Sequence, residues 1–193
     1  MRIDYEKDRS IQSNENFPFD PTEIDVVVLT HAHIDHSGNL PTLIRMGFEG
    51  QILCTPATAD LTELLLFDSV NIFMGKINKS RKHNRKKNHH PAQQPLYLQK
   101  HVMDTVERFV TIGFNRPFRI NGNIELTFVP VGHLLGAGAA VFKISDHGEE
   151  KTIAFTGDIG RKNYPVLDDP QDLPHVDYLV TESTYGGRVH TKD

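Results

Sequence analysis

Apolar residues in the first part of the chain follow two different periods. Residues 24–30 (Ile-Asp-Val-Val-Val-Leu-Thr) are rich in β-branched side chains and almost continuously apolar, which predicts a strand buried on both faces. Residues 51–55 predict a second, shorter strand. Helical spacing of leucine, valine and phenylalanine predicts helices at residues 57–73 and 98–109, and a short helix fits residues 39–46. Strands and helices therefore alternate in this part of the chain.

The later part of the chain has the pattern of a β-structure. Short β-branched or apolar runs separated by Gly, Asn and Asp predict strands at residues 118–120, 124–131, 139–144, 152–156 and 176–181. Strands and helices alternate in the first part of the chain, and strands dominate the later part. This order favours a layered α/β (α+β) domain over an all-β barrel.

Composition restricts the class of protein. The 193 residues are 38% hydrophobic and 24% charged, as in a soluble globular domain. No run approaches the roughly 18 apolar residues of a membrane span, and the N-terminus has no apolar signal core, so we expect no membrane association and a cytoplasmic location. Cys54 is the only cysteine, which excludes an internal disulfide and a cysteine-based zinc site. Homo-oligomer formation is left open.

A basic run stands out in a chain whose formal net charge is −4. We expect residues 76–95 to form a basic loop within the domain. Such a loop can attract a polyanion, or it can be a solvated segment without a partner, and composition alone does not separate these interpretations. The run contains no acidic residue among Lys76, Lys79, Arg81, Lys82, Arg85, Lys86 and Lys87.

The strongest chemical signal is a cluster of potential metal ligands directly after the first predicted strand. The sequence His31-x-His33-x-Asp35-His36 places four such side chains in six residues. In an extended chain, side chains two positions apart point the same way, so His31 and His33 can hold one metal ion together. Asp35 and His36 follow where the chain leaves the strand and can hold a second. Imidazole nitrogen and carboxylate oxygen are ligands that zinc accepts when no thiolate is offered.

Two weaker signals lie at the ends of later predicted strands. His133 follows residues 124–131 and has glycines on both sides, which allow the backbone to approach a crowded centre. Asp158 follows residues 152–156 in a Gly-Asp pair that by itself indicates only a turn. Combined with the first cluster, they predict one metal site assembled from three strand ends.

This order of motifs (HxHxDH, a Gly-His strand end, a strand ending in Gly-Asp) resembles the metallo-β-lactamase superfamily. The resemblance implies an αββα sandwich, two sheets packed together between layers of helices. It also implies a ligand set for two zinc ions. His31, His33 and His133 would hold the first zinc, Asp35 and His36 the second, and Asp158 would bridge both.

A further motif, Glu-Ser-Thr-Tyr-Gly-Gly-Arg beginning at Glu182, resembles the β-CASP group of RNA-processing nucleases, which includes ribonuclease J and the mRNA 3′-end cleavage endonuclease. In that group the acidic residue supports the metal-binding histidines. The resemblance therefore implies Asp35, Asp158 and Glu182 as catalytic residues. It implies single-stranded RNA as the partner. It also implies that RNA is hydrolysed by a hydroxide shared between two zinc ions roughly 3.5–4 Å apart.

The chain departs from the family at both ends. The first strands, the β-CASP insertion with its catalytic histidines and the C-terminal completion of the domain have no counterpart in residues 1–193, so we expect a partial metallo-β-lactamase domain, the N-terminal part of a longer protein. Two other functions stay open. One is a hydrolase of the same fold that acts on a small substrate such as a thioester or lactone. The other is an inactive module that binds RNA or a partner without cleaving it.

Overall fold

The computed structural model describes residues 16–84 and 95–188 of the chain. Its first sheet is formed by three parallel strands, β1 (Val26–Val28), β2 (Gln51–Cys54) and β3 (Phe109–Thr111), in the order β1-β2-β3. Parallel neighbours need crossover connections, which helices provide here. The predicted strands at residues 24–30 and 51–55 are thus both present, with shorter bounds.

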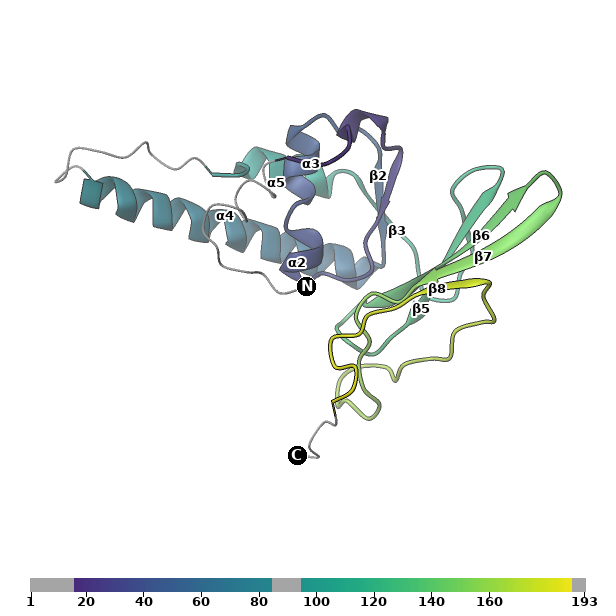
Figure 1. The fold of residues 1–193 in the computed structure, drawn as a ribbon. Coiled ribbons are helices and arrows are strands. Elements are labelled where there is room, and N and C mark those ends of the chain that lie inside the picture. The colour runs from purple at the N-terminus through teal and green to yellow at the C-terminus, as the bar shows by residue number, and fades with distance from the viewer. Residues whose placement is uncertain (1–15, 85–94, 189–193) are drawn as a thin grey trace.

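Helices cover one face of this sheet (Figure 1). After the 3₁₀ turn η1 (Pro21–Glu23) and β1 come α2 (Ile34–Ser37) and α3 (Leu40–Arg45); between β2 and β3 lie the long α4 (Pro56–Asn84) and α5 (Gln99–Val106). The interface between helices and sheet excludes water because its side chains are apolar and almost fully buried. Its core consists of Leu29, Leu40, Leu43, Phe48, Ile52, Cys54 and Ala59.

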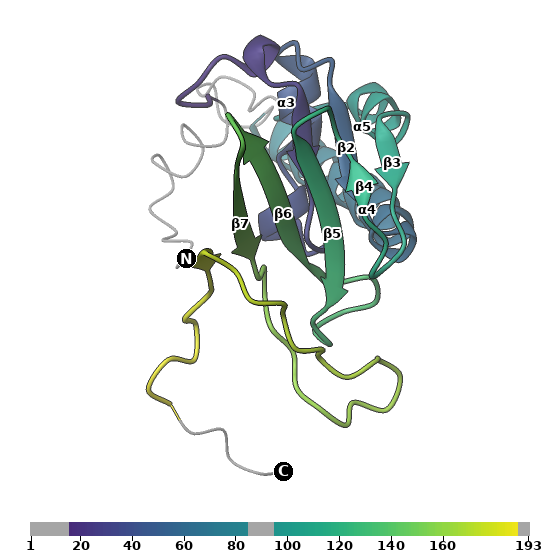
Figure 2. The same cartoon turned by 90° about the vertical axis from the view of Figure 1, so that its right-hand side faces the viewer.

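The second sheet contains the strands predicted in the later part of the chain. Its order is β4 (Phe118–Arg119), β5 (Ile124–Pro130), β6 (Gly138–Asp146), β7 (Glu149–Phe155) and β8 (Tyr178–Val180). Strands β4 to β7 pair antiparallel, whereas β8 pairs parallel to β7. Figure 2 looks onto this sheet, and the first sheet and its helices lie behind it.

The two sheets pack face to face through alternate side chains of their strands. Leu53 of β2 and Ile112, which directly follows β3, meet Leu126, Phe128 and Ala140 from the second sheet, all buried. The residues between these on β5 and β6 point to the opposite face, as the two-residue period of a strand requires. This arrangement confirms the predicted layered α/β fold.

The far face of the second sheet lacks helices in the described ranges. There Val129, Val141 and Ala154 are covered by Leu173 and Val176, which lie on the long connection between β7 and β8. The described residues therefore form a layer of helices followed by two sheets. These are three of the four layers of the expected αββα sandwich.

Three local predictions are corrected by the structure. Residues 109–111 form strand β3, because pairing with β2 outweighs the helical pattern expected to reach residue 109. Residues 34–37 form the short helix α2, which the pattern did not indicate. The loop expected at residues 76–95 is wrong for 76–84, which continue α4; lysine and arginine are good helix formers and no Gly or Pro interrupts this part. Residues 85–94 lie outside the described ranges. None of the described helices is long and apolar enough to cross a membrane.

Candidate metal site

The predicted ligands meet at one edge of the two stacked sheets. His31 and His33 lie on the loop that follows β1, and Asp35 and His36 lie on α2 directly after it. His133 follows β5, and Asp158 follows β7. Since β5 and β7 both pair antiparallel with β6, their carboxyl ends lie at the same edge, and packing brings that edge to the end of β1.

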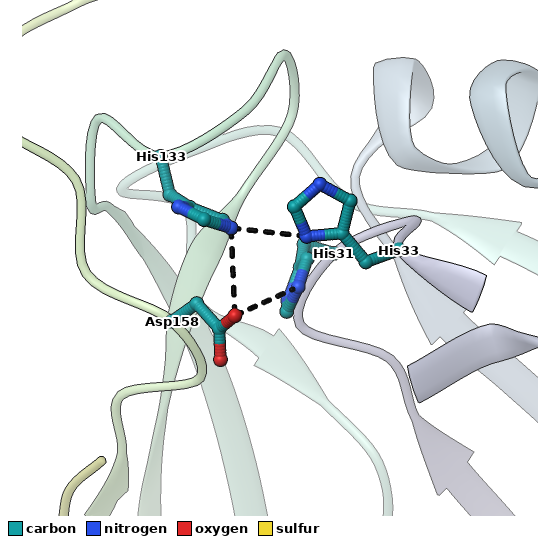
Figure 3. A group of neighbouring side chains, drawn as sticks. All are labelled: His31, His33, His133 and Asp158. Carbon is teal, nitrogen blue, oxygen red and sulfur yellow. Dashed lines mark hydrogen bonds and ion pairs between the residues drawn. The ribbon is translucent and has the colours of Figure 1, made fainter. Parts of the chain in front are cut away.

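Four of these side chains point toward one another (Figure 3). Nδ1 of His33 lies 3.1 Å from Nε2 of His133. Oδ2 of Asp158 lies 3.5 Å from Nε2 of His133 and 3.7 Å from Nε2 of His31. One ligand atom from each of the four residues lies within 4.8 Å of all the others. Three imidazoles and a carboxylate at this spacing form a donor set suited to a divalent transition metal.

The other two predicted ligands lie beside this group, and the His36 ring packs on the His31 ring with 4.1 Å between centroids. Nε2 of His36 is 3.4 Å from Oδ1 of Asp158 and 3.8 Å from Oδ2 of Asp35. Asp35 is the most open member of the site, with its side chain 57% exposed. The structure therefore brings all six predicted metal ligands together, with one oxygen of Asp158 near His31 and His133 and the other near His36.

Burial keeps the central histidines unprotonated. Desolvation lowers the pKa of His31 from 6.5 to about 3, helped by His36, His133 and His33 and opposed by Asp35. Desolvation also lowers the pKa of His133, although the negative charge of Asp158 acts in the opposite direction. Only a neutral imidazole offers a lone pair to a metal ion, so these shifts leave the donors ready at neutral pH.

The burial and hydrogen bonding of His31 indicate whether a metal ion fits the site. This residue is 1% exposed, and its Nε2 atom has no hydrogen-bond partner among the residues that the structure describes. A buried polar nitrogen without a partner is costly, and such atoms in native proteins usually have a specific reason. A cation held between His31 Nε2, the other two imidazoles and Asp158 would supply the missing partner.

A close backbone contact fixes the loops of His133 and Asp158 against each other. The Gly160 amide donates to the carbonyl of Val131 at 2.8 Å. A Cβ atom at Gly160 would overlap the carbonyl of Gly132, the residue before His133. The loops can approach this closely only because position 160 is glycine, which fits the expectation that glycines surround the centre.

Glu182 supports the site through the loop of Asp158. It follows β8, and its Oε1 atom accepts a hydrogen bond from the Ile159 amide at 2.6 Å. Partial burial acts to raise the pKa of Glu182, but the hydrogen bonds from Ile159 and Thr184 outweigh it and hold the pKa below its usual value. The charge of Glu182 raises the pKa of His133, so the two are electrostatically coupled. The carboxylate thus bonds to the backbone beside Asp158, whereas the sequence led us to expect support of the histidines.

Three hydroxyl groups that sequence reasoning missed also hold the site loops. Thr55 and Thr58 both donate to the carbonyl of Gly136, on the loop of His133, at 2.7 and 2.9 Å. Ser37 donates to the carbonyl of Ala32 at 2.9 Å, which ties the end of α2 to the loop between the first two histidines. Threonine and serine at strand and helix ends are too common for their spacing to have indicated this role.

A cavity of about 880 Å³ opens beside the carboxylate side of the site. His36, Asp158 and Glu182 line one end, and the rest extends between the two sheets. That inner part has apolar walls, formed mainly by Val26, Val28, Ile120, Ile124, Phe142, Ile144 and Phe155. Polar side chains in the lining include Thr30, Asn121, Thr156 and Thr181.

The chain has two stacked sheets and a group of histidines and an aspartate at the ends of their strands. These features are those of a class of metal-binding α/β proteins. Residues 8–187 match the family of the β-lactamase superfamily domain. The chain belongs to this superfamily, whose metallo-β-lactamase fold implies a divalent metal site. The predicted resemblance is confirmed.

Two curated proteins that are similar to this chain have names that refer to RNA cleavage or to transcription. Ribonuclease TTHA0252 of Thermus thermophilus is 33% identical over 174 residues, which cover 90% of this chain and 35% of the relative. Transcription termination factor FttA of Methanothermobacter thermautotrophicus is 34% identical over 166 residues, or 85% of this chain and 23% of the relative. The chain thus spans only a minor part of the length of either relative. A solved B3 metallo-β-lactamase is 17% identical with a TM-score of 0.42, covering 81% of this chain and 52% of that one.

Proposed function

We propose that this chain carries the metal-binding part of a zinc-dependent RNA phosphodiesterase of the β-CASP group. The observation that supports this most directly is the Asp158 carboxylate, whose Oδ2 faces His31 and His133 while its Oδ1 faces His36. A carboxylate whose two oxygens face different imidazoles is suited to be shared by two metal ions. The names of the relatives favour RNA as the substrate.

In this proposal His31, His33 and His133 hold one zinc ion, Asp35 and His36 hold the other, and Asp158 is common to both. When bound, zinc supplies activation of water near neutral pH and offsets negative charge on the phosphodiester. The burial that lowers the pKa of His31 and His133 makes these two ligands without prior loss of a proton. Glu182 restrains the loop of Asp158 through the Ile159 amide, so the shared carboxylate keeps its orientation.

RNA affinity in this proposal comes in part from the basic run. Lys and Arg contacts to phosphate add affinity without sequence preference, and a local run can supply them in a chain of net charge −4. The proposed location is the cytoplasm, in keeping with a chain whose single cysteine, Cys54, leaves no disulfide framework of the kind common in secreted proteins.

Metal content per chain is the first test, by elemental mass spectrometry on folded protein of confirmed intact mass. We expect close to two zinc ions per chain. A value close to one would overturn the dinuclear form of the proposal and leave the group of His31, His33, His133 and Asp158. Folded protein without metal would overturn the proposal.

The choice of substrate is tested on zinc-loaded protein with a labelled single-stranded RNA and a chromogenic ester. We expect cleavage of the RNA, its loss in His31→Ala, and its retention in the control His147→Ala, whose histidine is 94% exposed on the β6–β7 hairpin. Hydrolysis of the ester alone would identify a small-substrate hydrolase. RNA binding without cleavage by fully loaded protein would identify a binding module.

A further inference from the structure

Thr30 contacts both halves of the metal site although it offers no ligand itself. It directly precedes His31, and its Oγ1 atom lies 3.1 Å from Nδ1 of His31. This nitrogen is on the side of the ring away from the site, since Nε2 is the atom that faces Asp158. The hydroxyl of Thr30 is thus placed to decide which nitrogen of His31 carries the proton.

The orientation of the Thr30 side chain is restricted by its neighbours. Its backbone carbonyl accepts a hydrogen bond from Gly138 at 3.0 Å, which joins the end of β1 to the start of β6. A Cβ atom at Gly157 would lie 2.7 Å from Oγ1 and 2.8 Å from Cβ of Thr30. Gly157 also has a φ of +58°, a left-handed conformation that glycine adopts readily. The residue before Asp158 therefore packs directly on the hydroxyl that contacts His31.

A neutral imidazole carries one proton, which leaves two arrangements for this contact. In the first, Nδ1–H of His31 donates to Thr30 Oγ1, and the lone pair of Nε2 faces Asp158 and the other imidazoles. In the second, the Thr30 hydroxyl donates to Nδ1, and Nε2 carries the proton into the site. Only the first arrangement makes Nε2 a metal donor, and hydrogen bonds to the outer nitrogen commonly set this choice in metal-binding histidines.

We propose that Thr30 is a positioning residue that holds His31 with Nδ1 protonated and Nε2 free to bind metal. The hydroxyl acts as the acceptor, and Gly157 keeps it in place. Thr30 thereby couples the ring orientation of His31 to the loop that carries Asp158. This inference deepens the proposed function and rests on it for the identity of the metal site.

The tautomer of His31 can be measured directly in the metal-free wild-type protein. Long-range ¹H–¹⁵N correlation spectra with ¹⁵N-labelled histidine distinguish a protonated Nδ1 from a protonated Nε2, and His31→Gln assigns the signal. We expect Nδ1 to carry the proton. A proton on Nε2 would overturn the inference, whether or not the protein binds metal. Absence of metal binding by wild-type protein with Nδ1 protonated would instead count against the proposed function.

Variants then test the consequence for affinity. Thr30→Val replaces the hydroxyl with a methyl group of similar size, and Thr30→Ser keeps the hydroxyl. We expect Thr30→Val to weaken zinc affinity about 10–100-fold in chelator competition, with Thr30→Ser close to wild type. Equal affinity of folded Thr30→Val and wild type would overturn the inference. If Thr30→Val does not fold, the tautomer of His31 in the wild-type and Thr30→Ser proteins tests the inference. A proton on Nε2 in Thr30→Ser would contradict the role of the hydroxyl.

Discussion

Oδ1 of Asp158 lies 3.4 Å from Nε2 of His36, whereas Oδ2 of the same carboxylate faces His31 and His133. The two residues come from different sheets, since His36 follows β1 and Asp158 follows β7. Their proximity therefore depends on how the two sheets stack. It places one carboxylate within reach of the histidines of both proposed metal ions.

Asp158→Asn should remove more metal than Asp35→Asn. The first change takes the charge from a carboxylate that lies near His31, His36 and His133, whereas Asp35 pairs with His36 and is 57% exposed. We expect Asp35→Asn to retain about one ion per chain and Asp158→Asn to retain less. Elemental analysis with Asp146→Asn as an exposed control measures this. Equal metal content in all three variants would contradict the shared role of Asp158.

Acid should destabilise the metal-free protein through His31. Because the folded pKa is about 3 and the ordinary value is 6.5, the unfolded chain binds a proton in this window that the folded chain does not. The stability is therefore complete above pH 6.5 and is lost as pH falls toward 3, by at most about 1.4 kcal/mol per pH unit. We expect His31→Gln to have a shallower pH dependence in urea unfolding. A parallel dependence in both proteins would contradict the assigned burial effect.

Gly160→Ala should destabilise the fold strongly. The new Cβ would overlap the carbonyl of Gly132 and force apart the loops of His133 and Asp158. We expect a loss of about 3 kcal/mol in the free energy of unfolding, as for other changes that overfill a close contact. Gly122→Ala is the matched control, because nothing lies within 4 Å of a Cβ there, and its effect should stay within about 0.5 kcal/mol. Denaturant unfolding of both variants decides.

Glu182→Gln should weaken metal binding without removing a ligand. The change replaces the charged acceptor of the Ile159 amide with a neutral one, so the loop of Asp158 is held less firmly. We expect zinc affinity to fall about tenfold in chelator competition. Glu149→Gln, an exposed change at the start of β7, serves as control and should leave affinity unchanged. Wild-type affinity in Glu182→Gln would limit this residue to a packing role.

Neutralising the basic run should reduce the salt dependence of RNA binding. Lys82, Arg85, Lys86 and Lys87 carry charge without acidic neighbours in the sequence. For each side chain that pairs with a phosphate, its replacement should reduce the slope of log affinity against log salt by about 0.7, because one fewer group of counterions is released. Glutamine at all four positions is compared with glutamine at the exposed Lys151 and Lys162. An unchanged slope in the fourfold variant would remove the basic run from RNA binding.

The sequence by itself determined most elements and all six proposed ligands. Both kinds of information are local: a two-residue or helical period identifies an element, and His31-x-His33-x-Asp35-His36 is a single short run. His133 and Asp158 were recognisable only because weak strand-end signals occurred in the order of a known family. Local patterns failed where a distant partner decided the conformation, as when pairing with β2 turned residues 109–111 into a strand.

Only the tertiary structure decided how these residues face one another. His33 and His133 are 100 positions apart, and stacking of the sheets brings their ring nitrogens within 3.1 Å. The contact of Glu182 with the Ile159 amide and of Thr30 with His31 Nδ1 likewise depends on side-chain direction and loop packing. A short sequence pattern does not specify such contacts. Glu182 reaches the Ile159 amide because β7 and β8 lie side by side, and the neighbours Thr30 and His31 meet because packing sets the direction of both side chains.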